Sequence, residues 1–126
     1  MALAGCGTAS PAETVPTEAD KTDDNYRVFY EIFVGSFADS DGDGTGDLNG
    51  ILRHLDYLND GNLLSDTSLG VQGLWLTPIF ASPSYHKYDA TDYYRIDSDF
   101  GTEYVLRALL DACHSRNLNV IVDLVI

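Results

Sequence analysis

Residues 118–125 read Leu-Asn-Val-Ile-Val-Asp-Leu-Val, a nearly continuous apolar stretch with the length of one strand. Such a stretch is typical of a strand that is buried on both faces of a parallel sheet. Residues 27–34 and 71–77 are also rich in aromatic and β-branched side chains. Pro78 ends the second of these stretches, because proline cannot donate a hydrogen bond to a neighbouring strand. The sequence therefore predicts three strands.

An amphipathic helix is predicted in each interval between these strands. Asp47 and Thr102 can each cap the beginning of a helix, and apolar residues recur behind them at steps of three and four. These residues are Leu48, Ile51, Leu52, Leu55 and Leu58 in the first helix and Val105, Leu106, Leu109, Leu110 and Cys113 in the second. Cys113 is predicted to be a small core residue and not a reactive thiol. Residues 78–101 have little apolar periodicity and are predicted to form a long, functional loop.

The order strand, helix, strand, helix, strand predicts an α/β fold in which right-handed crossovers place the strands parallel and adjacent. Two architectures fit, an open doubly wound sheet and the N-terminal portion, about three βα units, of a (β/α)8 TIM barrel. No G-x-G-x-x-G motif follows the first strand, which weakens a dinucleotide-binding version of the open sheet. In both architectures the loops after the strands carry the ligand site. The chain has 126 residues, whereas a complete barrel needs about 250.

The formal net charge is −13 at pH 7. Nucleic acid and an anionic membrane surface would repel such a chain, so the sequence predicts no nucleic-acid partner and favours a neutral or cationic one. No apolar run is long enough to span a bilayer. Acidic residues gather in the leading segment and in residues 39–47, which we call the acidic loop.

The acidic loop places carboxylates at alternate positions, with glycines between them that allow the chain to curl. Calcium takes six to eight oxygen ligands. The predicted ligands are the side chains of Asp39, Asp41, Asp43 and Asp47 and the backbone carbonyl of Thr45, with water completing the shell; magnesium is a second possibility. An EF-hand is excluded because Gly50 stands where that loop needs glutamate. We expect the ion to pin the loop and not to catalyse.

Residues 1–25 are predicted to be a lipobox-like start followed by a flexible linker. Cys6 follows Leu-Ala-Gly and precedes a tether rich in Thr, Ser, Pro and Glu. The apolar stretch of an export signal is missing before Cys6, so we expect the true start to lie upstream of Met1. Lipidation of Cys6 would anchor the protein to a membrane of the bacterial cell envelope, and we expect an envelope or extracellular location.

Residues 26–126 resemble the alpha-amylase family of glycoside hydrolases, whose fold is a (β/α)8 barrel. Four segments in the correct order carry the resemblance. They are Tyr-Glu-Ile-Phe-Val-Gly-Ser-Phe-Ala-Asp at 30–39, Asp-Gly-Thr-Gly-Asp-Leu at 43–48, Gly-Leu-Trp-Leu-Thr-Pro at 73–78, and Tyr-His-Lys-Tyr-Asp-Ala-Thr-Asp-Tyr-Tyr at 85–94. By this resemblance, Tyr88 stacks on the sugar beside the scissile bond, His86 lies near the same sugar, and Asp123 orients active-site groups. Lys87 departs from the glycine that the family often has between the histidine and the tyrosine.

The resemblance implies hydrolysis of α-glucosidic bonds of starch-like α-glucans with retention of configuration. It also implies that the nucleophilic aspartate and the general-acid glutamate lie beyond Ile126, so residues 26–126 are read as a barrel truncated after its third strand. The 126-residue chain is therefore predicted to be inactive alone. Two alternatives stay open, a calcium-dependent, envelope-anchored glycan-binding module and a fragment without independent function.

Overall fold

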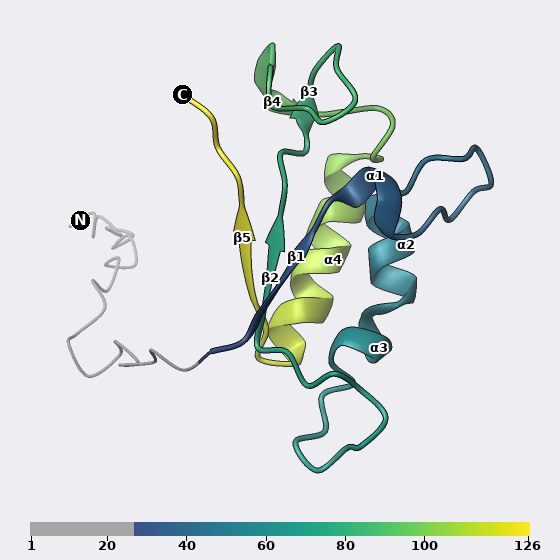
Figure 1. Ribbon diagram of the computed structural model, residues 1–126, viewed down its shortest axis with the longest axis vertical. Coiled ribbons are helices and arrows are strands. Elements are labelled where there is room, and N and C mark those ends of the chain that lie inside the picture. Colours follow the sequence, from purple (N-terminus) through teal and green to yellow (C-terminus); the bar gives the residue numbers. More distant parts are fainter. Residues whose placement is uncertain (1–26) are drawn as a thin grey trace, which may run out of the picture.

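A computed structural model of the chain describes residues 27–126 (Figure 1). The predictions for residues 1–25, including the linker and the lipidation of Cys6, lie outside the described residues. Among the described residues, no helix is both long enough and apolar enough to cross a membrane.

Three parallel strands form the centre of the fold (Figure 1). They are β1 (Phe29–Ile32), β2 (Gly73–Leu76) and β5 (Asn119–Val122), in the spatial order β1-β2-β5. The strands are in register along their whole length, so Ile32, Leu76 and Val122 are partners at their carboxyl ends. The predicted parallel, adjacent arrangement is confirmed.

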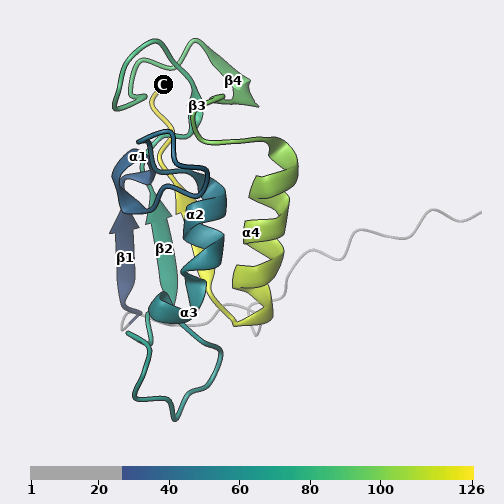
Figure 2. The same cartoon turned by 90° about the vertical axis from the view of Figure 1, so that its right-hand side faces the viewer.

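Helices cover one face of this sheet (Figure 2). They are α2 (Leu48–Arg53), α3 (Leu55–Leu58) and α4 (Glu103–Ser115), whereas the short α1 (Val34–Phe37) lies at the carboxyl end of β1. Leu74 and Leu76 of β2 are fully buried within the apolar core, whereas Trp75 between them is 42% exposed. Glu31 and Ile121, the partners of Trp75 on the neighbouring strands, are exposed as well. The described residues thus form an α/β structure in which helices cover one face of the sheet and the other face is open.

Both predicted helix caps are confirmed. The Asp47 carboxylate accepts the N–H of Gly50 at 2.7 Å, and the Thr102 hydroxyl accepts the N–H of Val105 at 3.4 Å. Cys113 lies fully buried on α4 among the core residues. Burial raises the pKa of its thiol to about 11, so the prediction of an unreactive core cysteine is confirmed.

Residues 48–58, predicted as one helix, form two segments separated at His54. The His54 backbone has φ −106° and ψ 14°, outside the helical region, and its ring Nδ1 lies 2.9 Å from the Gly50 carbonyl oxygen. The apolar spacing continues across this break, which is why the sequence did not predict it.

The predicted strands are too long, and the first does not reach Val34, which begins α1 as a buried residue. Residues 118–125 contain only the four-residue β5, whose side chains alternate between exposed and half-buried. The expected burial on both faces is therefore wrong, because helices pack on one face only (Figure 2).

Residues 78–101 contain an antiparallel pair that the sequence did not predict. It consists of β3 (Phe80–Ala81) and β4 (Asp92–Ile96). Phe80 meets Tyr93 edge to face, with ring centroids 5.5 Å apart. A two-residue strand gives no detectable alternation of apolar and polar residues, so the pair becomes visible only in the three-dimensional structure.

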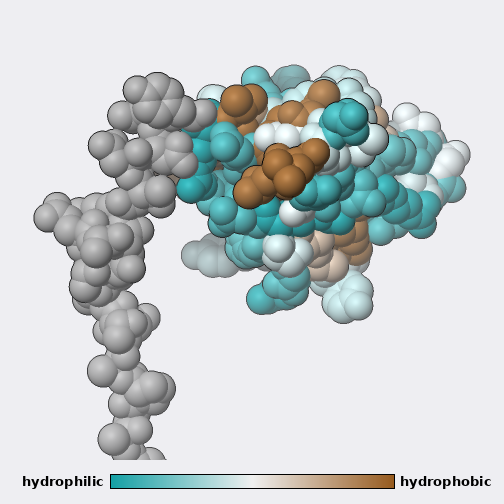
Figure 3. Space-filling model, turned by 90° about the horizontal axis from the view of Figure 1, so that it is seen from below, coloured by the Kyte–Doolittle hydropathy of each residue, from teal (hydrophilic) through white to brown (hydrophobic). Residues whose placement is uncertain are grey.

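The end of the molecule opposite the β3–β4 pair is formed in part by the connection between α3 and β2. This connection exposes Leu63 and Leu64 almost completely. Figure 3 views the molecule from that end, where apolar atoms lie within a largely hydrophilic surface.

Candidate functional site

The carboxyl ends of β1, β2 and β5 point toward one end of the molecule, which we call the rim (Figure 1). The acidic loop follows β1 and the short helix α1. The connection between β3 and β4, residues 82–91, follows β2 and is called the aromatic loop here. Asp123 comes directly after β5. Three segments that are far apart in the sequence therefore meet at the rim, as the sequence predicts.

Asp123 is held by two donors from different segments. Its Oδ1 accepts the indole N–H of Trp75 at 2.6 Å, and its Oδ2 accepts the hydroxyl of Tyr88 at 2.8 Å. The hydrogen bond to the Asp123 carboxylate is the main reason why the pKa of Tyr88 lies above its ordinary value, so this hydroxyl remains a donor. The structure thus joins two predicted site residues, Tyr88 and Asp123, at one carboxylate.

Trp75 is a member of this site that was not predicted from the sequence. Trp75 alternates with the buried Leu74 and Leu76, and this alternation places its side chain on the opposite face of β2. An aromatic residue on that face, one strand away from Asp123, is the signal that could have identified it. Glu31 faces Trp75 in the register, and its charge also contributes to the raised pKa of Tyr88.

His86 lies beside Tyr88 on the aromatic loop, with the two ring centroids 5.7 Å apart. Its Nδ1 accepts the backbone N–H of Tyr88 at 3.2 Å, which requires the tautomer that carries its proton on Nε2. Nε2 is then a donor. An exposed donor next to an exposed aromatic ring suits the hydroxyl groups and the C–H face of a sugar.

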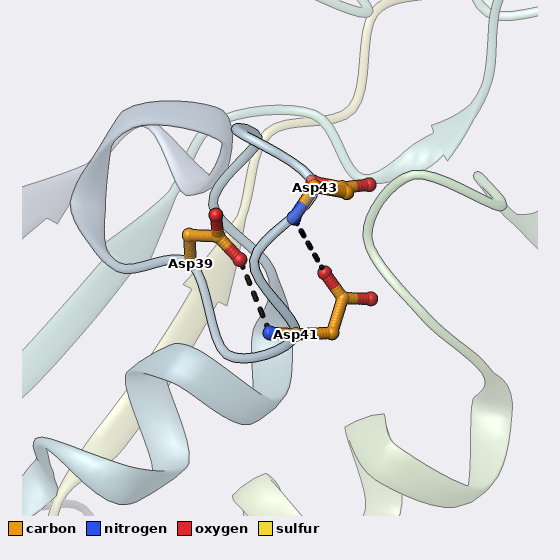
Figure 4. A group of neighbouring side chains, drawn as sticks. All are labelled: Asp39, Asp41 and Asp43. Atoms are coloured by element: carbon orange, nitrogen blue, oxygen red, sulfur yellow. Dashed lines mark hydrogen bonds between the residues drawn. The ribbon is translucent and has the colours of Figure 1, made fainter.

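Carboxylates at the beginning of the acidic loop converge, as Figure 4 shows. Asp39, Asp41 and Asp43 each offer a carboxylate oxygen, and these oxygens lie within 4.8 Å of one another. Backbone N–H groups fix the carboxylates: Asp41 N–H donates to Asp39 at 3.1 Å, and Asp43 N–H donates to Asp41 at 3.2 Å. Oxygens of exposed carboxylates at this spacing are suitable ligands for a divalent cation.

Asp39 is the most constrained member of this cluster. The N–H groups of Gly42 and Gly44 donate to its two oxygens at 2.6 and 2.8 Å. These two hydrogen bonds are the main reason why the pKa of Asp39 lies below its ordinary value. Both glycines have a positive φ, of 88° and 94°, which lets the loop curl around this carboxylate.

Asp47, the fourth predicted carboxylate ligand, is not part of the converging group. Asp47 is buried, and its two oxygens accept the N–H groups of Gly50 at 2.7 Å and Ser40 at 2.8 Å. The N–H of Thr45 donates to the Asp43 carboxylate at 2.7 Å, which places its backbone beside the cluster. The structure therefore brings three of the four predicted carboxylate ligands together, while Asp47 ties the loop to α2.

Comparisons with known proteins identify the family of this chain. Residues 31–126 match the family model described as alpha amylase, catalytic domain. Alpha-amylase 3 of Dictyoglomus thermophilum is 48% identical over 99 residues, which are 79% of this chain and 18% of that protein. A cyclomaltodextrinase of Geobacillus thermopakistaniensis is 48% identical over 78 residues, which are 62% of this chain and 12% of that protein.

Solved structures of the same family also match this chain. The crystal structure of an alpha-amylase from H. orenii matches with a TM-score of 0.75 and 59% identity over 76% of this chain and 20% of that one. Amy13B of Eubacterium rectale matches with a TM-score of 0.73 and 54% identity over 82% of this chain and 19% of that one. The chain thus spans a fifth or less of the length of these relatives.

Proposed function

Because the chain belongs to the alpha-amylase family of glycoside hydrolases, we propose that it supplies part of the substrate rim of an enzyme that hydrolyses α-glucosidic bonds in starch-like α-glucans. The observation that carries the proposal is the shared carboxylate of Asp123, which holds Tyr88 from the aromatic loop and Trp75 from β2. A ring fixed through its hydroxyl can present its face to a sugar without losing further conformational freedom on binding.

The proposed reaction proceeds with retention, which needs two carboxyl groups about 5 Å apart, one as nucleophile and one as acid and base. We assign neither role to any residue described here. Tyr88 and His86 would bind the sugar, and Asp123 would keep Tyr88 in position. The proposed pair of catalytic carboxylates belongs to the larger part of the relatives that this chain does not span.

The finer architecture that we propose is the first three βα units of a (β/α)8 barrel. The three parallel strands follow one another in sequential order and their helices cover one face (Figure 2), which is the arrangement of consecutive βα units in a barrel. The open face carries Glu31, Trp75 and Ile121 in one row. Such a row fits the interior of a barrel, where side chains from neighbouring strands form layers.

A calcium ion fits the acidic loop. Asp39, Asp41 and Asp43 would hold it, with the Thr45 carbonyl and water as further ligands, and magnesium would keep more of its own water. Asp47 would act mainly through its cap on α2, because both of its oxygens already accept N–H groups. The ion would offset most of the negative charge of the cluster and stiffen the loop, without a part in the chemistry.

The lipid anchor at Cys6 is a separate proposal, supported by the residues around that cysteine alone. Labelling of expressing cells with a radioactive fatty acid tests it. Labelled protein that becomes unlabelled in a Cys6→Ser variant would support the anchor, and unlabelled wild-type protein would reject it.

The proposed activity is tested with the protein expressed from its whole gene. Release of maltose or glucose from maltoheptaose, with the α-anomer as the first product seen by proton NMR, is the expected result. The chain of residues 1–126 expressed alone is expected to release none. Binding of maltoheptaose without hydrolysis by the whole-gene product would instead favour the glycan-binding module, and neither binding nor hydrolysis would reject both functions.

A further inference from the structure

The aromatic loop carries Tyr88 and His86, and almost all of its residues are exposed or half-buried. Within residues 82–96, each of which the structure describes, Lys87 is the only buried residue, with 5% of its surface exposed. Lysine is rarely buried, because removing its ammonium from water is costly unless the charge is paired. The burial of Lys87 is therefore a specific feature of this loop.

Two carboxylates and one aromatic ring surround the ammonium of Lys87. Its Nζ lies 3.1 Å from Oδ1 of Asp97, 2.8 Å from Oδ2 of Asp99 and 5.4 Å from the ring centroid of Phe100. Burial alone would lower the pKa of Lys87, but its hydrogen bonds to Asp99 and Asp97 outweigh burial, so its pKa is raised and it stays charged. The ion pairs connect the middle of the aromatic loop to the turn between β4 and α4.

Asp97 is itself firmly fixed. It is buried, and its carboxylate accepts the N–H of Ser82 at 2.9 Å and that of Asp99 at 3.0 Å. Its own N–H donates to the carbonyl of Ile79 at 2.9 Å. Lys87 is therefore paired with a carboxylate that the backbone on both sides of the aromatic loop holds in place.

The backbone at Lys87 is left-handed, with φ 62°. This conformation turns the lysine inward while its neighbours His86 and Tyr88 remain exposed at the rim. The Tyr88 N–H donates a hydrogen bond of 3.2 Å to Nδ1 of His86, and this bond closes the turn around Lys87. One buried side chain thus sets the direction of the two predicted sugar ligands on either side.

We propose that Lys87 is a positioning residue of the α-glucan site, which holds Tyr88 against Asp123 through its ion pairs with Asp97 and Asp99 and does not touch the sugar. The inference rests on the proposed function, because the position of Tyr88 matters to activity only if it contacts the substrate. A ring held in place stabilises bound substrate and transition state equally. Its displacement therefore raises KM and leaves kcat nearly unchanged.

The test measures kcat and KM for maltoheptaose with the protein expressed from its whole gene. Lys87→Met is expected to raise KM about tenfold with little change in kcat, and Lys87→Arg, which keeps the charge, to recover most of the loss. Because Lys87→Met leaves Asp97 buried without its cation, a second variant, Lys87→Met with Asp97→Asn, removes both charges and is expected to show the same rise in KM. Arg107→Met removes an exposed ion pair with Glu103 on α4 and is the matched control, with both constants unchanged.

A role in folding alone would lower the amount of active enzyme, so that kcat falls while KM stays constant. That result, or an unchanged KM in active Lys87→Met enzyme and in its double variant with Asp97→Asn, overturns the inference and leaves the proposed function standing. A wild-type protein that hydrolyses no α-glucan overturns the proposed function and this inference with it.

Discussion

The acidic loop and the aromatic loop lie at the same rim, but different interactions hold them in place. The acidic loop is shaped by its backbone: N–H groups fix its carboxylates, and the Gly46 N–H closes its base on the Gly35 carbonyl at 2.8 Å. The aromatic loop depends on the buried ammonium of Lys87, which forms ion pairs with two carboxylates of the same chain.

This difference predicts which of the two loops responds to a cation from solution. The acidic loop gathers three exposed carboxylates, so a cation that relieves their repulsion would come from solution. The aromatic loop already contains its cation. We therefore expect the acidic loop to respond to calcium, and the aromatic loop to respond to changes in its own side chains.

The largest effect on stability is expected from a methyl group at the base of the acidic loop. A Cβ at Gly50 would lie 1.9 Å from the Ala38 carbonyl oxygen, so the backbone would have to move. Gly50→Ala should lower the free energy of unfolding by about 3 kcal/mol, measured by urea denaturation. Gly70→Ala is the comparison variant, because a Cβ at Gly70 meets no other atom but the backbone has φ 64°. This substitution should lower the free energy of unfolding by about 1 kcal/mol. Equal costs would show that the base of the acidic loop is not tightly packed.

Removal of the Tyr88 ring should have the largest effect on activity. Tyr88→Ala loses both the surface for the sugar and the bond to Asp123, and should lower kcat/KM for maltoheptaose about 100-fold. Tyr88→Phe loses only the bond and should lower it about tenfold. Tyr104→Ala, which removes an exposed tyrosine from α4, is the control and should leave activity unchanged. A phenylalanine variant as active as the wild type would show that the bond to Asp123 does not position the ring.

Calcium should stabilise the protein through the acidic loop. At about 100 times its dissociation constant, an ion raises the free energy of unfolding by about 2.7 kcal/mol. Asp41→Asn should abolish most of this gain, because it removes a charged ligand of the converging group. Asp66→Asn, an acid in the connection between α3 and β2, should keep all of it. An equal gain in both variants would place the ion elsewhere.

The smallest effect concerns pH and the aromatic loop. Burial would raise the pKa of Asp97, but the N–H groups of Ser82 and Asp99 and the charge of Lys87 outweigh it, so the pKa lies below its ordinary value of 3.8. A lowered pKa in the folded state gives stability that is present above pH 3.8 and is lost as the pH falls through the folded pKa. The stability difference between wild type and Asp97→Asn should therefore be constant from about pH 7 to 5 and shrink below 3.8. A difference that grows toward acid would mean that Asp97 is protonated in the folded protein.

The parallel strands, both helix caps and the meeting of the loops at one rim were predictable, because apolar periodicity and capping residues are local signals. The break at His54 and the β3–β4 pair were not, since neither interrupts or creates a pattern along the chain. At the site, the sequence singled out Tyr88 and Asp123 but not the bond between them, which joins residues 35 positions apart. The burial of Lys87 depends on Asp97 and Asp99, so its role became visible only in three dimensions.

The role of Tyr88 in sugar binding is tested by a crystal structure of the whole-gene product, grown with calcium chloride and maltotriose. We expect a glucose ring to lie on the face of Tyr88, with the Tyr88 hydroxyl still bonded to Asp123. A sugar bound away from Tyr88, or a Tyr88 side chain detached from Asp123 in the complex, would contradict it.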